Sequence, residues 1–104
     1  MTKTSDKCRW QEMQDDIGAF TDKTFSHSTV ASKMAHLKEE CDEVTADPQD
    51  LHEWADCLIL LLDAARRAGH NIDDLHKAVS EKMDINKKRN WGAADQDGVV
   101  RHVD

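Results

Sequence analysis

Five acidic residues lie in two short clusters whose spacing suits the binding of a metal ion. Glu39, Glu40 and Glu43 form E-E-x-x-E, and ten residues later Glu53 and Asp56 form E-x-x-D. Residues three apart on a helix point in nearly the same direction. Two such pairs on neighbouring helices would surround a hard divalent cation with oxygen ligands.

The first cluster is expected on a helix with one apolar face. The position of each acid relative to that face indicates which acids are the better candidates for metal ligands. That face centres near Leu37 and Cys41. Glu40 borders it, Glu43 lies further round, and Glu39 points most nearly away. Glu40 and Glu43 are therefore predicted as metal ligands, whereas Glu39 is predicted to support the site or to hold a second ion.

The helix expected around the second cluster has leucines on opposite sides. Leu58 and Leu62 share one face, while Glu53, Asp56 and Leu60 lie on the other. Apolar residues on both sides indicate burial on both sides, with one side in a bundle core and the other against a second subunit. Buried carboxylates are costly unless they are paired or bound to metal. Glu53 and Asp56 thus complete the predicted ligand set.

A stripe of opposite sign follows near the C-terminal end. Lys82, Asn86 and Arg89 are spaced i, i+4 and i+7 on one helix face, where two cations and an amide can bind phosphate oxygens.

The acidic clusters and the cationic stripe also have an ordinary structural interpretation. The acids could form a solvated helix face, and the cations could be surface charge at a helix C-terminus. Acids beside apolar positions on two consecutive helices favour the metal site.

Aromatic and imidazole side chains are the candidates for contact with a nucleobase. Phe20 and Phe25 could stack on a base, although Trp10 and Phe20, at helical spacing, are more often core residues. His36 precedes Glu40 by four residues on the same face, so it is predicted to line the same pocket, with a surface position as the alternative.

Helical spacing of apolar residues extends through most of the chain and predicts an all-α fold, a compact bundle of about four helices. The helices are expected from about Asp6 to Asp22, Thr29 to Thr45, Asp50 to Ala68 and Asn71 to Asn90. Ser28 or Thr29 and Asp50 are the expected N-caps, and Gly69 the expected stop. Residues 1–92 are predicted to form one domain, and residues 93–104 a flexible tail.

Composition limits the classes of function. The chain has 104 residues, a formal net charge of −7 and 38% hydrophobic residues. It has no long basic run, so nucleic acid is not an expected partner, and its longest apolar run is too short to cross a membrane. Such a small core favours an oligomer. Three cysteines in no paired spacing predict buried thiols, at Cys41 and Cys57, and a cytoplasmic protein.

Three segments resemble a known family: H-L-K-E-E-C-D-E-V (36–44), E-W-A-D-C-L-I-L-L-L-D-A-A-R-R-A-G (53–69) and K-M-D-I-N-K-K-R-N-W-G (82–92). They are similar to the all-α NTP pyrophosphatase superfamily, the MazG-like enzymes, and more narrowly to its dATP/dGTP diphosphohydrolase branch, which includes phage members. The resemblance covers about Phe20 to Gly92.

The resemblance implies a Mg²⁺-dependent enzyme, with Mn²⁺ as a substitute, that forms a homodimer or homotetramer. Its reaction hydrolyses a purine nucleoside triphosphate, dGTP or dATP, to the monophosphate and pyrophosphate. If the protein is phage-encoded, it would act in the host cytoplasm, where it could supply dGMP to a 2-aminoadenine pathway.

The family's motif residues carry over by position. Glu40, Glu43, Glu53 and Asp56 become metal ligands, and Glu43 or Glu39 becomes the acceptor of the water proton. The same resemblance implies that Lys82, Asn86 and Arg89 contact the phosphates of the substrate.

Two alternatives stay open on the residues alone. A non-catalytic helical dimer, acting as a regulatory or interaction module, would bind neither metal nor nucleotide. A ferritin-like metal protein ranks last, because no histidine follows a glutamate by three residues.

Overall fold

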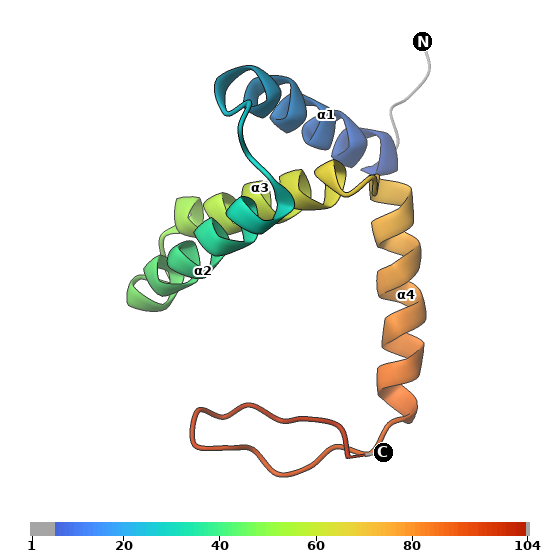
Figure 1. The fold of residues 1–104 in the computed structure, drawn as a ribbon. Helices are drawn as coiled ribbons and strands as arrows, with labels where there is room; N and C mark the ends of the chain where they lie inside the picture. Colours follow the sequence, from blue (N-terminus) through green and yellow to red (C-terminus); the bar gives the residue numbers. More distant parts are fainter. Residues whose placement is uncertain (1–5, 104) are drawn as a thin grey trace. The chain divides into compact units, whose positions relative to one another are not determined.

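The computed structural model describes the backbone of residues 6–103 and the side chains of residues 9–103. Within this range the chain forms four helices and no strand, apart from an isolated bridge between Trp91 and His102 (Figure 1). The helices are α1 (Asp6–Thr24), α2 (Val30–Ala46), α3 (Leu51–Arg67) and α4 (Ile72–Lys88). The predicted all-α fold with four helices is confirmed, and each predicted end lies within two residues of the observed one.

Side chains at the predicted positions fix the helix ends. Thr29 caps α2 in a reciprocal pair with Ser32, since each side chain accepts a hydrogen bond from the other residue's backbone N–H. The Asp50 carboxylate accepts from the His52 N–H at 3.0 Å at the start of α3. Gly69, with φ of 96°, follows α3 in the left-handed region that glycine adopts without steric cost.

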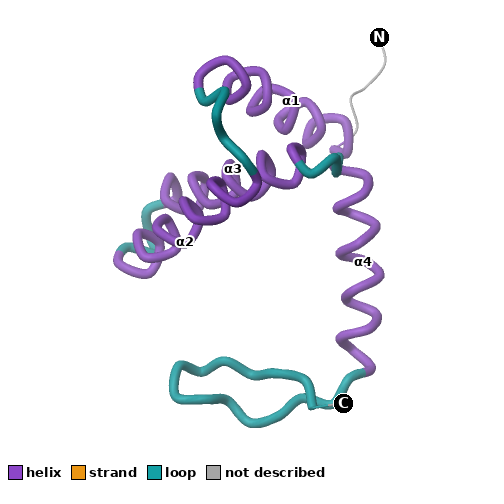
Figure 2. The backbone as a smooth tube through the Cα atoms, in the orientation of Figure 1, coloured by secondary structure: helices purple, strands orange, loops and turns teal. Residues whose placement is uncertain are grey.

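The chain divides into two compact units, Met1–Asp73 and Asp74–Asp104. In the first unit α3 is the central helix, and both α1 and α2 pack against it. Figure 2 shows α2 and α3 lying side by side, joined by a short turn. Because this turn is short, the second half of α2 faces the first half of α3. Those two halves carry the acidic clusters.

The residues through which α1 packs against α3 are not the regularly spaced apolar residues of the α1 sequence. Its buried positions are Gln14, Gly18 and Thr21, whereas Trp10 and Phe20 are 45% and 60% exposed. The expectation that these two aromatic residues belong to the core was therefore wrong within a single chain. Small and polar residues allow close approach and hydrogen bonding across this contact: the Gln14 amide, for example, donates to the Leu62 carbonyl at 3.2 Å.

A buried ion network holds the three helices of the first unit together. Asp63 on α3 is 1% exposed. It accepts hydrogen bonds from Thr21 Oγ1 at 3.0 Å, Arg66 Nε at 3.0 Å and Arg67 Nε at 3.3 Å, and it pairs with Lys33 of α2 at 3.4 Å. Burial acts to raise the pKa of Asp63, but the bonds from Arg66, Thr21 and Arg67 and the charge of Arg66 outweigh it. The pKa therefore lies below its usual value.

Gly18 gives Arg66 room to join this network. A Cβ atom at Gly18 would lie 2.5 Å from Arg66 Nε. Arg66 also reaches Asp22 at the end of α1, with Nη2 2.7 Å from Oδ1. A larger residue at Gly18 would push the guanidinium away from both carboxylates.

One face of α3 is left uncovered by the other helices of the first unit. Leu60 and Leu62 are buried, but Leu51 is 77% exposed, and Leu58 and Leu61 are also exposed. Burial of one side in the core agrees with the prediction for α3, and burial of the other side against a second subunit remains a prediction.

The buried-thiol prediction was also wrong. Cys41 is exposed and Cys57 only half-buried, because no helix of the first unit covers the outer surface of the α2–α3 pair beside them. Partial burial, followed by the neighbouring Cys41 thiol, still raises the pKa of Cys57. The side chain of Cys8 lies outside the described residues.

The second unit contains most of α4 and the loop that follows it. None of the described residues of α4 is fully buried. After Trp91 the chain turns back on itself: the Gly92 N–H donates to the Arg101 carbonyl at 2.8 Å, and the Val103 N–H donates to the Asn90 carbonyl at 2.9 Å. These bonds give residues 92–103 a defined local fold. The single domain over residues 1–92 and the flexibility of residues 93–104 remain predictions.

Candidate metal centre and substrate cavity

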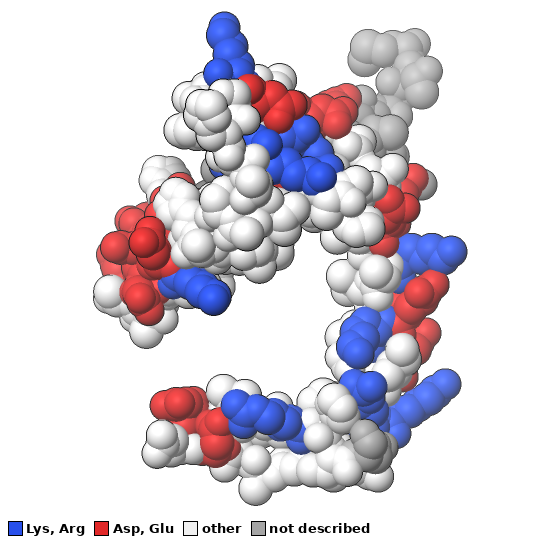
Figure 3. Space-filling model, viewed as in Figure 1, with Lys and Arg blue, Asp and Glu red and all other residues white. Residues whose placement is uncertain are grey.

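The α2–α3 pair brings three of the predicted acids together. Glu40 from α2 and Glu53 and Asp56 from α3 each offer a carboxylate oxygen, and these oxygens all lie within 4.8 Å of one another. Within the described residues, no lysine or arginine forms an ion pair with Glu53 or Asp56. Figure 3 shows acidic side chains gathered over the end of the α2–α3 pair. The group is therefore a concentration of negative charge, and His36 beside Glu40 is the basic side chain that pairs with it among the described residues.

The electrostatics of Glu53 reflect this concentration. Partial burial is the first cause that raises its pKa, and the charges of Asp50, Glu43, Asp56 and Glu40 follow. A divalent cation among these oxygens would remove the repulsion, and carboxylates are the ligands that hard cations prefer. The donor set in this structure therefore fits a Mg²⁺- or Mn²⁺-type ion.

The other two predicted acids lie outside this group of three. Glu43 is exposed, but it is close enough for its charge to act on Glu53. Glu39 is also exposed, one residue before Glu40 on α2. The roles of Glu39 and Glu43, as ligand or proton acceptor, remain predictions.

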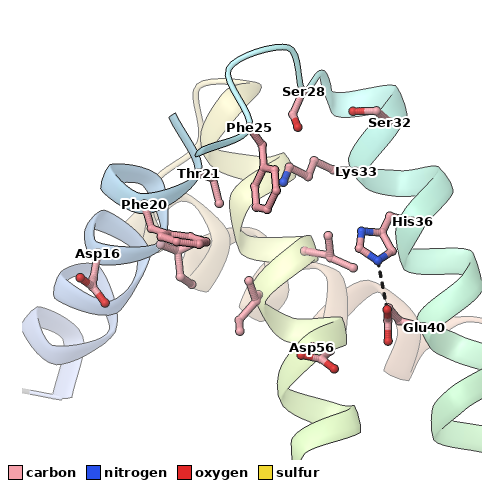
Figure 4. Close-up of a pocket in the computed structure, with 13 residues that line it drawn as sticks. Asp16, Phe20, Thr21, Phe25, Ser28, Ser32, Lys33, His36, Glu40 and Asp56 are labelled. Carbon is pink, nitrogen blue, oxygen red and sulfur yellow. Dashed lines mark hydrogen bonds and ion pairs between the residues drawn. The ribbon is translucent and has the colours of Figure 1, made fainter. Parts of the chain in front are cut away.

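A cavity of about 590 Å³ adjoins the acid cluster. Its wall includes Glu40 and Asp56 together with all three predicted base contacts, Phe20, Phe25 and His36 (Figure 4). The rings of Phe20 and Phe25 meet edge to face with centroids 5.8 Å apart. The His36 Nε2 atom lies 3.0 Å from Glu40 Oε1, so His36 lies where the acids meet the rest of the cavity. Contact of these three residues with a base remains a prediction.

Sequence reasoning missed the polar residues of this cavity. Lys33, Ser28, Ser32 and Asp16 also line it, and Lys33 is buried in the ion network with Asp63. A signal was present for Lys33, because it lies on the apolar stripe of α2. A charged residue on such a stripe indicates either a buried ion pair or a site.

The predicted phosphate contacts lie in the second unit. Lys82 is exposed on α4, and Asn86 and Arg89 are half-buried. Arg89 follows the last residue of α4, and its Nη1 lies 3.3 Å from His102 Nδ1. The carbonyl of Asn86 accepts a hydrogen bond from Trp91 Nε1 at 3.0 Å. Phosphate binding by these three residues remains a prediction.

Comparison with known proteins identifies the family. The model of the dATP/dGTP pyrophosphohydrolase family matches residues 13–104. The chain belongs to this family. The predicted relationship is therefore confirmed, and with it membership of a family of hydrolases that act on phosphoric anhydride bonds.

Curated relatives come from phages. A dATP/dGTP diphosphohydrolase of Salmonella phage PMBT28 is 40% identical over 93 residues, which are 88% of this chain and 31% of that protein. The Eaa protein of Salmonella phage P22 is 43% identical over 81 residues, 78% of this chain and 26% of that protein. The chain thus spans less than a third of the length of these two relatives. A dATP/dGTP diphosphohydrolase of Cyanophage S-2L is 35% identical over 94 residues, 88% of this chain and 86% of that protein.

A solved structure shares the fold. The Cyanophage S-2L MazG-like pyrophosphohydrolase, bound to dGDP and three catalytic Mn²⁺ ions per active site, superposes with a TM-score of 0.76 at 35% identity. The match covers 89% of this chain and 95% of that one. The predicted MazG-like fold is confirmed, and the Mn²⁺ ions bound to this neighbour agree with the predicted divalent metal cofactor. None of the helices in residues 6–103 has the length and hydropathy needed to span a bilayer.

Proposed function

We propose that this protein is a Mg²⁺-dependent diphosphohydrolase that converts a purine nucleoside triphosphate, dGTP or dATP, to the monophosphate and pyrophosphate. The observation that carries the proposal is the group of three carboxylates, Glu40, Glu53 and Asp56, at one end of a nucleotide-sized cavity. The names of the family and of two phage relatives, and the dGDP and Mn²⁺ bound to the Cyanophage S-2L protein, support it.

Glu40, Glu53 and Asp56 would hold the metal ion, with Glu43 as a further ligand. When bound, a divalent cation neutralises phosphate charge and favours the ionisation of water. His36 would orient Glu40 through their 3.0 Å contact. The apolar wall formed by Phe20 and Phe25 would hold the base and exclude water from one side of the substrate.

Glu43 is our first choice for the residue that accepts a proton from the attacking water. It is exposed and close enough for its charge to raise the pKa of Glu53, whereas Glu39 is not among the main charges that do so. Glu43→Gln should then lower kcat more than Glu39→Gln does. A larger loss in Glu39→Gln would assign the role to Glu39.

Lys82, Asn86 and Arg89 are proposed to contact the phosphates that leave as pyrophosphate. Their support is their chemistry, two cations and an amide, and their place in the K-x-x-x-N-x-x-R motif. Charge reversal at Lys82, which is exposed, should raise KM for the triphosphate.

A homodimer or homotetramer is proposed for the active protein. The observation in favour is the exposed apolar stripe of α3, Leu51, Trp54, Leu58 and Leu61, which would be costly to leave in water. Light scattering should give a mass of two or four chains for the intact protein. A Leu58→Lys variant should shift that mass toward the 11.8 kDa of one chain.

The phage origin of the relatives supports a place in the host cytoplasm and a role in phage nucleotide metabolism. A supply of dGMP to a 2-aminoadenine pathway is one such role, and it requires that dGTP be a good substrate.

The proposed activity is tested by incubating the protein with each of the eight common NTPs and dNTPs and Mg²⁺. Monophosphate and pyrophosphate should form from dGTP and dATP in preference to pyrimidine substrates. Stepwise release of inorganic phosphate would contradict the proposed bond cleavage. Absence of hydrolysis and of any thermal shift with Mg²⁺ and nucleotide would favour the non-catalytic helical dimer.

A further inference from the structure

A buried lysine in the cavity wall has no role in the function proposed above. Lys33 is 6% exposed. Its Nζ lies 3.4 Å from Asp63 Oδ2 and 4.9 Å from the centre of the Phe25 ring. Figure 4 shows the side chain extending from α2 to this ring, among the residues that line the cavity. An ammonium group has three N–H donors and no acceptor, so a carboxylate and a ring face leave it able to bind a ligand acceptor.

Asp63 only partly neutralises this lysine, because it is shared among several cations. Lys33, Arg66 and Arg67 all pair with Asp63, and both arginines also pair with Asp22. Three cations thus face two carboxylates, and one positive charge remains in excess among these five groups, while the carboxylates of Asp16, Glu40 and Asp56 lie elsewhere in the cavity wall. Such a wall favours a ligand that presents hydrogen-bond acceptors.

The acid cluster at the other end of the cavity limits how a nucleotide can lie there. Glu40 and Lys33 are on the same helix, seven residues apart, which is about 10 Å along its axis. A nucleotide whose phosphates are held at Glu40 would therefore place its base near Lys33. The wall between them includes Phe20 and Ile59, which suit the faces of a flat ring.

We propose that Lys33 is a specificity-determining residue that donates a hydrogen bond to N7 of a purine base, and also to O6 when the base is guanine. In guanine both atoms are acceptors, whereas adenine has N7 beside an amino donor. The contact therefore admits both purines, favours guanine and discriminates against pyrimidines, which have no N7. This inference rests on the proposed function, because it requires the base of the substrate to enter this cavity.

The test compares dGTP with 7-deaza-dGTP, in which a C–H group replaces N7. With the intact protein, kcat/KM for dGTP should exceed that for 7-deaza-dGTP by roughly 10- to 100-fold, the size expected for one hydrogen bond from a charged donor. In Lys33→Met the two substrates should have equal kcat/KM. Lys38→Met removes the same charge from an exposed position of α2 and should retain the difference.

The Lys33→Met variant is expected to fold. Methionine has a similar length and packs well against an aromatic ring such as that of Phe25, and Asp63 keeps its bonds from Thr21, Arg66 and Arg67. An NMR titration of the unaltered protein tests independently whether Lys33 contacts N7. The NMR signals of the Lys33 side chain should shift clearly more on addition of dGMP than on addition of 7-deaza-dGMP, which keeps O6 but lacks N7.

Equal kcat/KM for dGTP and 7-deaza-dGTP in the intact protein would overturn the inference. A preference for dGTP that persists in Lys33→Met would also overturn it, because another group would then contact N7. If the intact protein hydrolyses no triphosphate, the proposed function fails. The NMR titration still decides the role of Lys33, and equal shifts with both monophosphates would reject it.

Discussion

Asp56 and Asp63 lie seven residues apart on α3, on nearly the same face of the helix, yet their surroundings have opposite charge. Asp63 is enclosed by Lys33, Arg66 and Arg67, and its pKa is lowered. Asp56 lies beside Glu40 and Glu53, without an ion pair among the described residues, and the pKa of Glu53 is raised. The chain itself supplies cations for the first region, whereas the described residues supply no lysine or arginine to the second.

This difference separates stability from function along a single helix. The Asp63 network joins α1, α2 and α3 through hydrogen bonds and ion pairs, so it stabilises the packing of the first unit. The acid cluster joins only α2 and α3, and its mutual repulsion opposes their association. A bound divalent cation would offset this repulsion. Removal of one acid from each region should therefore have opposite effects on stability.

The largest effect on stability is expected for Asp63→Asn. Loss of this charge removes the ion pair of Lys33 and leaves Arg66 and Arg67 paired with Asp22 alone. It should lower the free energy of unfolding by about 3 kcal/mol. Urea denaturation at pH 7 would measure it. The control is Asp22→Asn, whose side chain is 58% exposed and should cost less than about 1 kcal/mol. Equal losses in the two variants would contradict the special role of Asp63.

Asp56→Asn should affect activity and spare the fold. Loss of even an outer partner of a metal site costs about 10- to 100-fold in affinity or activity, so loss of a ligand should lower kcat/KM by at least about 100-fold. The thermal midpoint without metal should not fall. Asp42→Asn, an exposed acid of α2 outside the group, should keep full activity. Normal turnover in Asp56→Asn would refute the metal assignment.

The pH dependence of stability should distinguish the two regions. The folded pKa of Asp63 is lowered, so its contribution is present above its unfolded value of about 3.9 and is lost as the pH falls toward its folded pKa. Unfolding titrations below pH 5 should therefore be steeper for the intact protein than for Asp63→Asn. Parallel curves would show that Asp63 is not a main source of the acid sensitivity.

The smallest effect is expected for Glu53→Gln in the absence of metal. Because the folded pKa of Glu53 is raised, its ionised form opposes folding at neutral pH, and the variant should have a slightly higher thermal midpoint than the intact protein. This gain should shrink as the pH falls through the raised pKa. Addition of Mn²⁺ should raise the midpoint of the intact protein but not that of Glu53→Gln. A lower midpoint in the metal-free variant would show that Glu53 stabilises the fold as Asp63 does.

Much of the local structure could be predicted because it depends on neighbouring residues. The apolar spacing, the caps at Thr29 and Asp50 and the stop at Gly69 act within a turn or two of chain, and the four helices followed from them. The pairing of the two acidic clusters was also predictable, since a short turn requires α2 and α3 to lie antiparallel. Three of the four predicted ligands, Glu40, Glu53 and Asp56, accordingly offer oxygens within 4.8 Å of one another.

Side-chain burial was harder to predict, because it depends on which elements meet. The apolar line through Trp10 and Phe20 indicated a core face, but α1 packs through Gln14, Gly18 and Thr21. These residues allow close approach and hydrogen bonds that an apolar pattern does not reveal. The leucines on both faces of α3 likewise gave no indication of which face its own chain would cover.

The sequence by itself determined the helices, the acid pairs and the likeness to a family, because each depends on residues a few positions apart. Only the tertiary structure decided that Asp63 is neutralised by cations while Glu53 and Asp56 are not, and that Lys33 of α2 lies in the wall of a cavity. The physical reason is that burial, pKa and ion pairing depend on distances between helices. Those distances are fixed only when α1 and α2 pack on α3.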